Sequence, residues 1–356
     1  MIRSEGFKEF LKREILINWD DDEGLQYKIP LDGDQNSAGD TNQKKAVLMP
    51  NWLSEFVLAL SVVTRYARDA DHEITLIVPE KFMSLCRLLS ALPVIPYSRK
   101  NSLHFLDSAA IVKESAFDKL YLLPHSFSSA WFGYKTGVPC CRGVSAEQRN
   151  QFLTENVSPE IISKENHLTN EYSIVLETEY IEPSSWPGVA IDKHDHYFGS
   201  VVICPGSGEV TRRWTGFEEL VKLWPDQHFV LLGDDNDIEA AKNIGRRLPH
   251  RVENLTGKTS LDEAAAIISG ASVVLSNDSG LMQIAGYIGT PVVGIFGGSS
   301  PLWRRPLGDA VRTITSSESL CQFCYKRECA KKNFQCMSTI MPENVISTAM
   351  EIMRLS

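Results

Sequence analysis

The chain has 356 residues, 36 basic and 45 acidic side chains, and a net charge of −9 with its histidines neutral. Hydrophobic residues make up 43% and charged residues 23%, which are globular proportions, and the length suits two α/β domains. The acidic balance argues against a nucleic-acid partner bound through overall charge.

The amino terminus is charged and lacks the apolar segment of a signal peptide, so we expect the chain to be cytoplasmic. Residues 279–303 carry no charge, but six glycines and two prolines interrupt them, which favours buried α/β core over a membrane span. Residues 1–43 are expected to form a flexible extension, because 20–41 are rich in polar residues and glycine without an apolar period.

Short apolar runs alternate with helical patterns over residues 44–180. A helix is expected to begin at Leu53, where apolar residues recur at spacings of three and four. Strands are expected at 46–50, 74–79, 92–97, 109–113 and 119–124. This alternation is typical of βαβ units and predicts an N-terminal Rossmann-like domain with a parallel sheet.

A second alternating series occupies residues 201–356. Strands are expected at 201–207, 228–233, 273–278 and 292–297, and helices near 217–224 and at 237–248, 261–269 and 280–288. Residues 181–200 contain two prolines and mixed charges, as an interdomain linker would. We therefore predict two doubly wound domains facing each other across a cleft, with ligands at the carboxyl ends of the strands.

The junction after the strand expected at 273–278 is a candidate phosphate site. The strand ends at Asp278, and a helix begins at Ser279 and Gly280. Free backbone N–H groups at a helix start bind phosphate, and a glycine allows close approach. The alternative is that Asp278 or Ser279 only caps the helix.

The loop at 204–214 is a second candidate, because its glycines free the backbone while Arg212 and Arg213 supply permanent positive charge. The guanidinium donor fork matches phosphate oxygens, which suits a diphosphate. The alternative is a solvated surface pair.

Glu55 is a candidate general base. It lies in the first turn of the first helix, about 200° around from Leu53, so it points away from the buried stripe. A carboxylate that faces the cleft can take a proton from a hydroxyl nucleophile. The alternative is an acid favoured there by the helix dipole.

Asp235 and Asp237 form an Asp-Asn-Asp triplet that resembles a metal-binding DxD motif, although a turn followed by a helix start explains it equally well. A stronger metal signal is C-x2-C-x4-C-x6-C, which can close a tetrahedral shell around structural zinc or iron. The alternative is four reduced thiols. The four cysteines of this pattern are Cys321, Cys324, Cys329 and Cys336.

These segments together resemble the ADP-heptose:lipopolysaccharide heptosyltransferases of glycosyltransferase family nine, especially the second heptosyltransferase type. The resemblance runs from about residue 46 to the carboxyl end, and its most specific part is the ordered pattern over 255–297. Supporting segments in the same order are PNWLSEFVLALSVV, LPHSFSSAWFGYKTGVPCCRG, CPGSGEVTRRW and the cysteine segment. The resemblance implies a GT-B fold, an inverting mechanism and no metal or other cofactor at the reaction centre.

The resemblance also implies roles for residues around the cleft. The family usually reads Asn-Trp-Leu-Gly-Asp after the first strand, with the aspartate as base; here Ser54 replaces the glycine and Glu55 the aspartate. The family's lysine in the second-domain loop corresponds to Arg212, which keeps the charge and stabilises the leaving diphosphate. Ser207 falls where other members contact phosphate, and Asp235 where they contact the nucleoside.

The family's Asp-Ser/Thr-Gly donor motif matches Asp278, Ser279 and Gly280, and Gln283 stands where a histidine is common. The implied partners are an ADP-heptose-like donor and a lipid-linked or core oligosaccharide acceptor, with peripheral contact to the inner face of the inner membrane. Two other interpretations stay open: a different enzyme on this fold, such as a sugar-nucleotide epimerase, and a non-catalytic nucleotide-sugar-binding protein.

Overall fold

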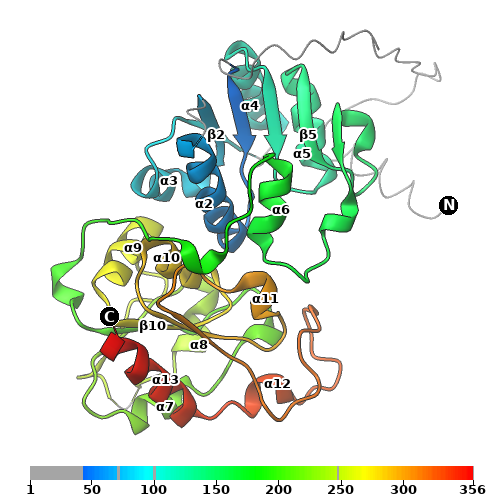
Figure 1. The fold of residues 1–356 in the computed structure, drawn as a ribbon. Helices are drawn as coiled ribbons and strands as arrows, with labels where there is room; N and C mark the ends of the chain where they lie inside the picture. The colour runs from blue at the N-terminus through cyan, green and yellow to red at the C-terminus, as the bar shows by residue number, and fades with distance from the viewer. Residues whose placement is uncertain (1–42, 70–72, 99–101, 247, 356) are drawn as a thin grey trace.

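Two parallel six-stranded sheets form the cores of the two lobes in Figure 1. The computed structural model describes residues 43–69, 73–98, 102–246 and 248–355. The first sheet has the order β3 (Val94–Tyr97), β2 (Ile74–Pro79), β1 (Lys45–Leu48), β4 (Lys119–Leu122), β5 (Cys140–Val144) and β6 (Glu155–Val157). The second has the order β12 (Val311–Ile314), β11 (Val292–Ile295), β10 (Val273–Asn277), β7 (Val201–Cys204), β8 (Phe229–Leu231) and β9 (Val252–Asn254). The predicted pair of doubly wound, Rossmann-like units is confirmed.

Helices connect the parallel strands and cover the sheets, which explains why the central strands are apolar on both faces. The helices of the first lobe are α2 (Leu53–Asp69), α3 (Met83–Leu89), α4 (Ser102–Glu114), α5 (Phe127–Thr136) and α6 (Leu168–Val175). Those of the second are α7 (Phe217–Leu223), α8 (Ile238–Ala241), α9 (Leu261–Gly270), α10 (Gly280–Ile288), α11 (Pro301–Arg304), α12 (Gln335–Ser338) and α13 (Pro342–Leu355). The C-terminal helix α13 packs on the second sheet and α7.

Two expected elements are wrong. The strand expected at 109–113 lies inside α4, where Ala109 and Val112 are buried while Ile111 is exposed. That spacing of three belongs to a helix, and a run of five apolar residues does not separate the two possibilities. The helix expected at 237–248 ends at Ala241, and Gly245 follows in the left-handed region with φ 68°.

The segment predicted as a linker is fixed along α10. Trp186 Nε1 donates to the carbonyl of Tyr287 at 2.7 Å. Gly188, at φ 81°, lies so close to Gly289 that an added Cβ would be 3.1 Å from its Cα. The predicted extension at 1–43 falls outside the described residues except for its last position.

The two lobes pack directly on each other through α2 against α10 and α3 against α9. Gly280 lies at this contact: a Cβ there would be 2.5 Å from Leu53 Cδ2. Ser84 Oγ donates to Asp262 Oδ1 at 3.0 Å across the same boundary. One apolar cluster therefore runs from the first lobe into the second.

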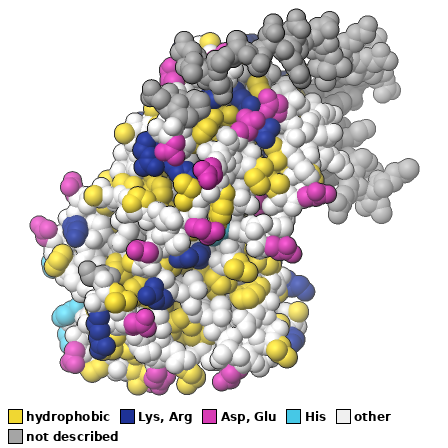
Figure 2. All heavy atoms as spheres, in the orientation of Figure 1, with side chains coloured by type: hydrophobic (Ala, Val, Ile, Leu, Met, Phe, Trp, Pro, Cys, Tyr) yellow, Lys and Arg dark blue, Asp and Glu magenta, His cyan; other side chains and the backbone are white. Residues whose placement is uncertain are grey.

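Acidic and basic side chains are interspersed over the face drawn in Figure 2. No helix in the described parts of the chain combines the length and the hydropathy that a membrane span needs.

Candidate active site

The carboxyl ends of four central strands supply the charged residues between the lobes. Glu55 follows β1 of the first sheet, whereas Arg212, Asp278 and Arg304 follow β7, β10 and β11 of the second. Because the carboxyl ends of parallel strands share one edge, the alternation predicted from sequence brings together the three residues of the second sheet, and the packing of the two lobes adds Glu55.

Asp278 is the centre of this group and is 2% exposed. Its Oδ2 accepts a hydrogen bond from Ser299 Oγ at 2.5 Å and lies 3.3 Å from Arg212 Nη1. Its Oδ1 lies 3.9 Å from Arg304 Nε and has no hydrogen-bond partner although it is buried. A buried carboxylate is retained at such a place only with cations beside it.

Arg212 faces Asp278 on one side and Glu209 on the other, with its Nη2 3.0 Å from Glu209 Oε2. Its Nε is buried without a hydrogen-bond partner. The guanidinium therefore has donor capacity left for an anionic ligand, the property expected for a diphosphate contact.

Glu55 comes from the other lobe, and its Oε1 lies 3.9 Å from Arg304 Nη2. Burial raises the pKa of Glu55 above its ordinary value, and Asp278 adds to that rise, while Arg304 and Arg212 oppose it. A carboxylate with a raised pKa is a stronger proton acceptor, which suits a general base.

Ser279 and Gly280 each make a structural contact at the start of α10. Ser279 Oγ accepts from the backbone N–H of Met282 at 3.3 Å, so this residue caps α10 as the structural alternative predicts. The missing side chain of Gly280 makes room for Leu53, which is a domain contact that the sequence interpretation did not foresee.

Ser207 and Arg213 shape the loop at 204–214. Ser207 Oγ donates to the backbone carbonyl of Asp278 at 3.0 Å, which ties the two candidate loops together. Arg213 Nε and Nη2 donate to the carbonyl of Ser207 at 2.8 and 2.7 Å. Its guanidinium is thus largely used within the loop, unlike that of Arg212.

The Asp-Asn-Asp triplet forms a capped turn. Asp234 and Asp237 cap the 3₁₀ turn Asp235–Asp237 reciprocally, and Asp237 Oδ1 lies 3.8 Å from Arg213 Nη2. Asp235 itself is exposed. Gly206 lies against this turn, because a Cβ there would be 2.0 Å from Asp237 Cγ.

Gln283 is fully buried and donates through Nε2 to the backbone carbonyl of Arg304 at 2.8 Å. It therefore supports α11. Sequence reasoning missed Arg304, although its position shortly after a buried strand is the same signal that identified Arg212.

Sequence reasoning also missed a pair of residues beside Glu55, Glu171 and His125. Glu171 Oε2 is buried, lacks a hydrogen-bond partner and lies 3.6 Å from His125 Nε2, while Oε1 accepts from Trp303 Nε1 at 3.4 Å. Burial raises the pKa of Glu171 to about 7, assisted by the charge of Glu55, and burial lowers the pKa of His125 to about 4. His125 follows β4, the neighbour of β1, so this pair belongs to the same edge of the first sheet.

The cysteine segment lies along the end of β11, where the backbone N–H groups of Phe323 and Tyr325 donate to the carbonyls of Gly297 and Gly298. Cys336 is buried, and the three other thiols of the segment are near enough to raise its pKa, after burial as the larger cause. Within the described parts of the chain, however, no three His, Cys, Asp or Glu side chains are placed to hold a metal ion. The predicted metal shell is thus not formed by these side chains as they stand.

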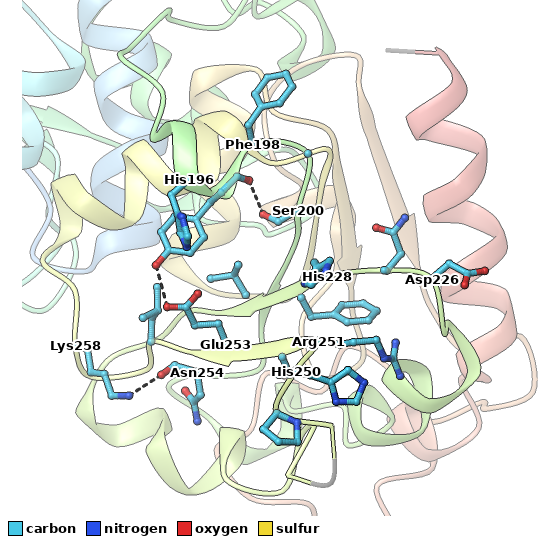
Figure 3. A pocket seen from close by; sticks show the side chains of 18 residues that line it. His196, Phe198, Ser200, Asp226, His228, His250, Arg251, Glu253, Asn254 and Lys258 are labelled. Atoms are coloured by element: carbon cyan, nitrogen blue, oxygen red, sulfur yellow. Dashed lines mark hydrogen bonds between the residues drawn. The ribbon is translucent and has the colours of Figure 1, made fainter.

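A separate cavity of about 910 Å³ lies at the amino ends of β7, β8 and β9, with lining residues shown in Figure 3. His228, His250 and Glu253 are exposed there, and Tyr197 donates to Glu253 Oε1 at 3.0 Å. This is the edge opposite to Arg212 and Asp278, so the cavity is not part of the candidate active site.

Comparison with known proteins decides the family. The sequence pattern described as glycosyltransferase family 9 (heptosyltransferase) matches residues 109–335, more than half of the chain. The chain belongs to glycosyltransferase family 9. Its membership confirms the predicted enzyme class and does not favour the epimerase alternative.

Individual members of family 9 are similar over most of their length. Lipopolysaccharide heptosyltransferase 2 of Escherichia coli K12 is 27% identical over 314 residues, which are 76% of this chain and 87% of the relative. Lipooligosaccharide heptosyltransferase 2 of Haemophilus ducreyi is 23% identical over 342 residues, 85% and 97% of the two chains.

Solved structures confirm the fold. The E. coli ADP-heptose lps heptosyltransferase II matches with a TM-score of 0.74 at 23% identity, covering 88% of this chain and 99% of that one. A family 9 glycosyltransferase from Veillonella parvula also has a TM-score of 0.74, at 20% identity, with 90% and 99% covered. The GT-B-type architecture predicted from sequence is therefore confirmed.

Proposed function

We propose that this family 9 glycosyltransferase moves a heptose from an ADP-heptose-like donor to a lipopolysaccharide core-type acceptor, with inversion. The observation that carries the proposal is the meeting of Glu55 from the first lobe with Arg212, Asp278 and Arg304 from the second. This arrangement places a proton acceptor, Glu55, in the first lobe. In the second lobe it places a cationic site for an anion, in which Arg212 Nε has no hydrogen-bond partner.

The names of similar proteins support the substrate class. The E. coli and H. ducreyi relatives are lipopolysaccharide and lipooligosaccharide heptosyltransferases. An E. coli heptosyltransferase of the same fold, with a TM-score of 0.63, has been solved with ADP-2-deoxy-2-fluoro heptose.

The proposed reaction is one displacement. Glu55 removes the proton from an acceptor hydroxyl, and the oxygen attacks the anomeric carbon on the face opposite the diphosphate. As that bond forms, the bond from the anomeric carbon to the diphosphate oxygen breaks and the nucleoside diphosphate leaves. Arg212 and the free N–H groups at the start of α10 stabilise the charge on the leaving group.

We further propose that residues 44–180 form the acceptor-side domain and 201–356 the donor-side domain, with Ser207 and Asp235 near the donor. A thermal-shift screen with ADP-, UDP- and GDP-sugars tests the donor class. Selective stabilisation by an ADP-sugar is expected, since a ligand that binds the native state raises the melting temperature. Selective stabilisation by a UDP- or GDP-sugar would reject the proposed donor.

We propose a cytoplasmic protein with a peripheral contact to the inner membrane, where a lipid-linked acceptor lies. Exposed basic residues beside the cysteines support this: Lys326, Arg327, Lys331 and Lys332. Each contributes about 1 kcal/mol near an anionic surface. Co-sedimentation with anionic but not neutral vesicles is expected, and replacing these four with glutamine should remove it. Equal recovery with both vesicle types would contradict the proposal.

We also propose one structural zinc or iron, outside the reaction centre, on Cys321, Cys324, Cys329 and Cys336. Their spacing supports it, and the related E. coli glycosyltransferase TibC is described as iron-containing. Because the thiols do not form a metal-holding group as they stand, metal binding requires them to move together.

Elemental analysis should find about one metal per chain, lost when Cys321 and Cys324 become serine. Cys140→Ser, outside the segment, should retain the metal. Metal-free protein with four titratable thiols, purified without chelator, would count against the site.

A further inference from the structure

Among the described residues, Arg304 is the one side chain within ion-pair distance of both Glu55 and Asp278. It is the last residue of α11 and only 5% exposed. Its Nη2 lies 3.9 Å from Glu55 Oε1, its Nε lies 3.9 Å from Asp278 Oδ1, and its guanidinium carbon lies 4.9 Å from the centre of the Trp303 ring. The guanidinium is thus buried between a carboxylate of each lobe.

The backbone around Arg304 is held from several sides. Gln283 donates to its carbonyl at 2.8 Å, and the Arg304 N–H donates to the carbonyl of Ser300 at 3.1 Å. Ser300 also caps α11 by accepting from Leu302 N–H at 3.1 Å. These bonds fix the direction in which the long side chain leaves the helix.

The two residues that flank Arg304, Trp303 and Arg305, are hydrogen-bonded to residues of α6 and its N-cap in the first lobe. Trp303 Nε1 donates to Glu171 at 3.4 Å, and His167 Nε2 donates to the carbonyl of Arg305 at 2.9 Å. His167 is itself fixed as the N-cap of α6, because its Nδ1 accepts from Thr169 N–H. Residues 303–305 therefore connect the two lobes, and the side chain of the middle residue, Arg304, lies beside Glu55.

We infer that Arg304 is a positioning residue that holds the carboxylate of Glu55 in place through its charge, so that the donor-side lobe completes the base of the acceptor-side lobe. This inference rests on the proposed function, because it takes Glu55 to be the base. Arg304 acts through Glu55, while Arg212, with its unpaired donor, is left to meet the diphosphate.

The charges around Glu55 give the direction of the effect. The cations near Glu55 are Arg304 from α11 and Arg212 from the 3₁₀ turn Val210–Arg212. The acidic groups near it are Asp278 after β10 and Glu171 on α6, and the phenol of Tyr172 lies next to Glu171 in the chain. Arg304 is the stronger of the two cations that lower the pKa of Glu55. Removing its charge leaves burial and Asp278 to raise that pKa further.

The test is the pH dependence of kcat/KM for Arg304→Gln. A neighbouring cation lowers a carboxyl pKa by roughly 1–3 units, and at 3.9 Å we expect the acidic limb to move up by about 1 pH unit. At pH values below the acidic limb, kcat/KM should fall by about tenfold, because one unit of pKa corresponds to a factor of ten. The Kd for ADP should change less than threefold.

Arg304→Lys should restore most of the acidic limb, because it keeps the charge, and it serves if the glutamine variant folds poorly. The matched control is Arg305→Gln, whose side chain donates to the carbonyl of Gly308 and should leave the limb in place. Melting temperatures verify that all variants are folded.

An unmoved acidic limb in folded Arg304→Gln would overturn the inference, as would a tenfold weaker ADP Kd with the limb unmoved, which would make Arg304 a diphosphate ligand. Failure of the proposed function looks different. In that case the wild type transfers no heptose, or transfers it with Glu55→Gln as active as the wild type, whereas failure of this inference alone leaves the wild type active, Glu55→Gln inactive and Arg304→Gln with a normal pH profile.

Discussion

Turnover of Glu55→Gln is expected to be lower by roughly 10²–10⁴-fold, with donor affinity nearly unchanged, which is the usual contribution of general-base catalysis. The amide keeps the size of the side chain but cannot take a proton at neutral pH. Because Arg304 then faces a neutral group, a modest change in stability is also expected. Steady-state kinetics and donor calorimetry measure the two effects separately.

Glu55→Asp is the sharper companion variant, since it restores the side chain that is usual in the family at this position. Retained or increased activity would show that the site tolerates either length, whereas abolished activity would show that the pocket around Arg304 has adapted to glutamate. If neither variant alters turnover, Glu55 is only a charge at a helix start and the base lies elsewhere.

Replacing Arg212 with alanine is expected to weaken binding of the nucleoside diphosphate by at least tenfold. Charge-assisted hydrogen bonds are worth about 1.5–3 kcal/mol, and Arg212 has an unpaired Nε beside the buried Asp278. Arg212→Lys should recover part of the loss, because it keeps the charge without the donor fork. Isothermal titration calorimetry with ADP provides the measurement.

The matched control is Arg213→Ala, because the guanidinium of Arg213 is used by the carbonyl of Ser207. A smaller loss of affinity is expected there. Unchanged ADP affinity in Arg212→Ala, or a larger loss in Arg213→Ala, would contradict the placement of the donor diphosphate beside Arg212.

Much of the fold could be predicted because parallel strands that are buried on both faces produce continuous apolar runs, as in β10 and β11. Errors arose where a run was short: residues 109–113 contain enough apolar side chains for a strand, yet their burial has a helical spacing in α4. The helix expected at 237–248 likewise ended early, at Ala241, and Gly245 follows in the left-handed region.

Parts of the candidate site followed from the rule that side chains after neighbouring strands converge, which brings Arg212 after β7 and Asp278 after β10 together. Glu55 followed separately, from its place in the first turn of α2 after β1. Its cross-lobe contacts could not be predicted in this way. Glu171 and Trp303 are 132 positions apart in the chain and meet only because the two lobes pack together. The same applies to Gly280, whose missing side chain reads as a phosphate-loop feature until Leu53 is seen beside it.

The most direct test of the central claim is product analysis. Purified enzyme is incubated with ADP-heptose and a lipopolysaccharide core acceptor, and the product is examined by mass spectrometry and by NMR of its anomeric carbon. The account predicts release of ADP, an acceptor heavier by one heptose, and inverted anomeric configuration, all greatly reduced in Glu55→Gln. A product with retained configuration, or no product under conditions in which both substrates bind, would contradict it.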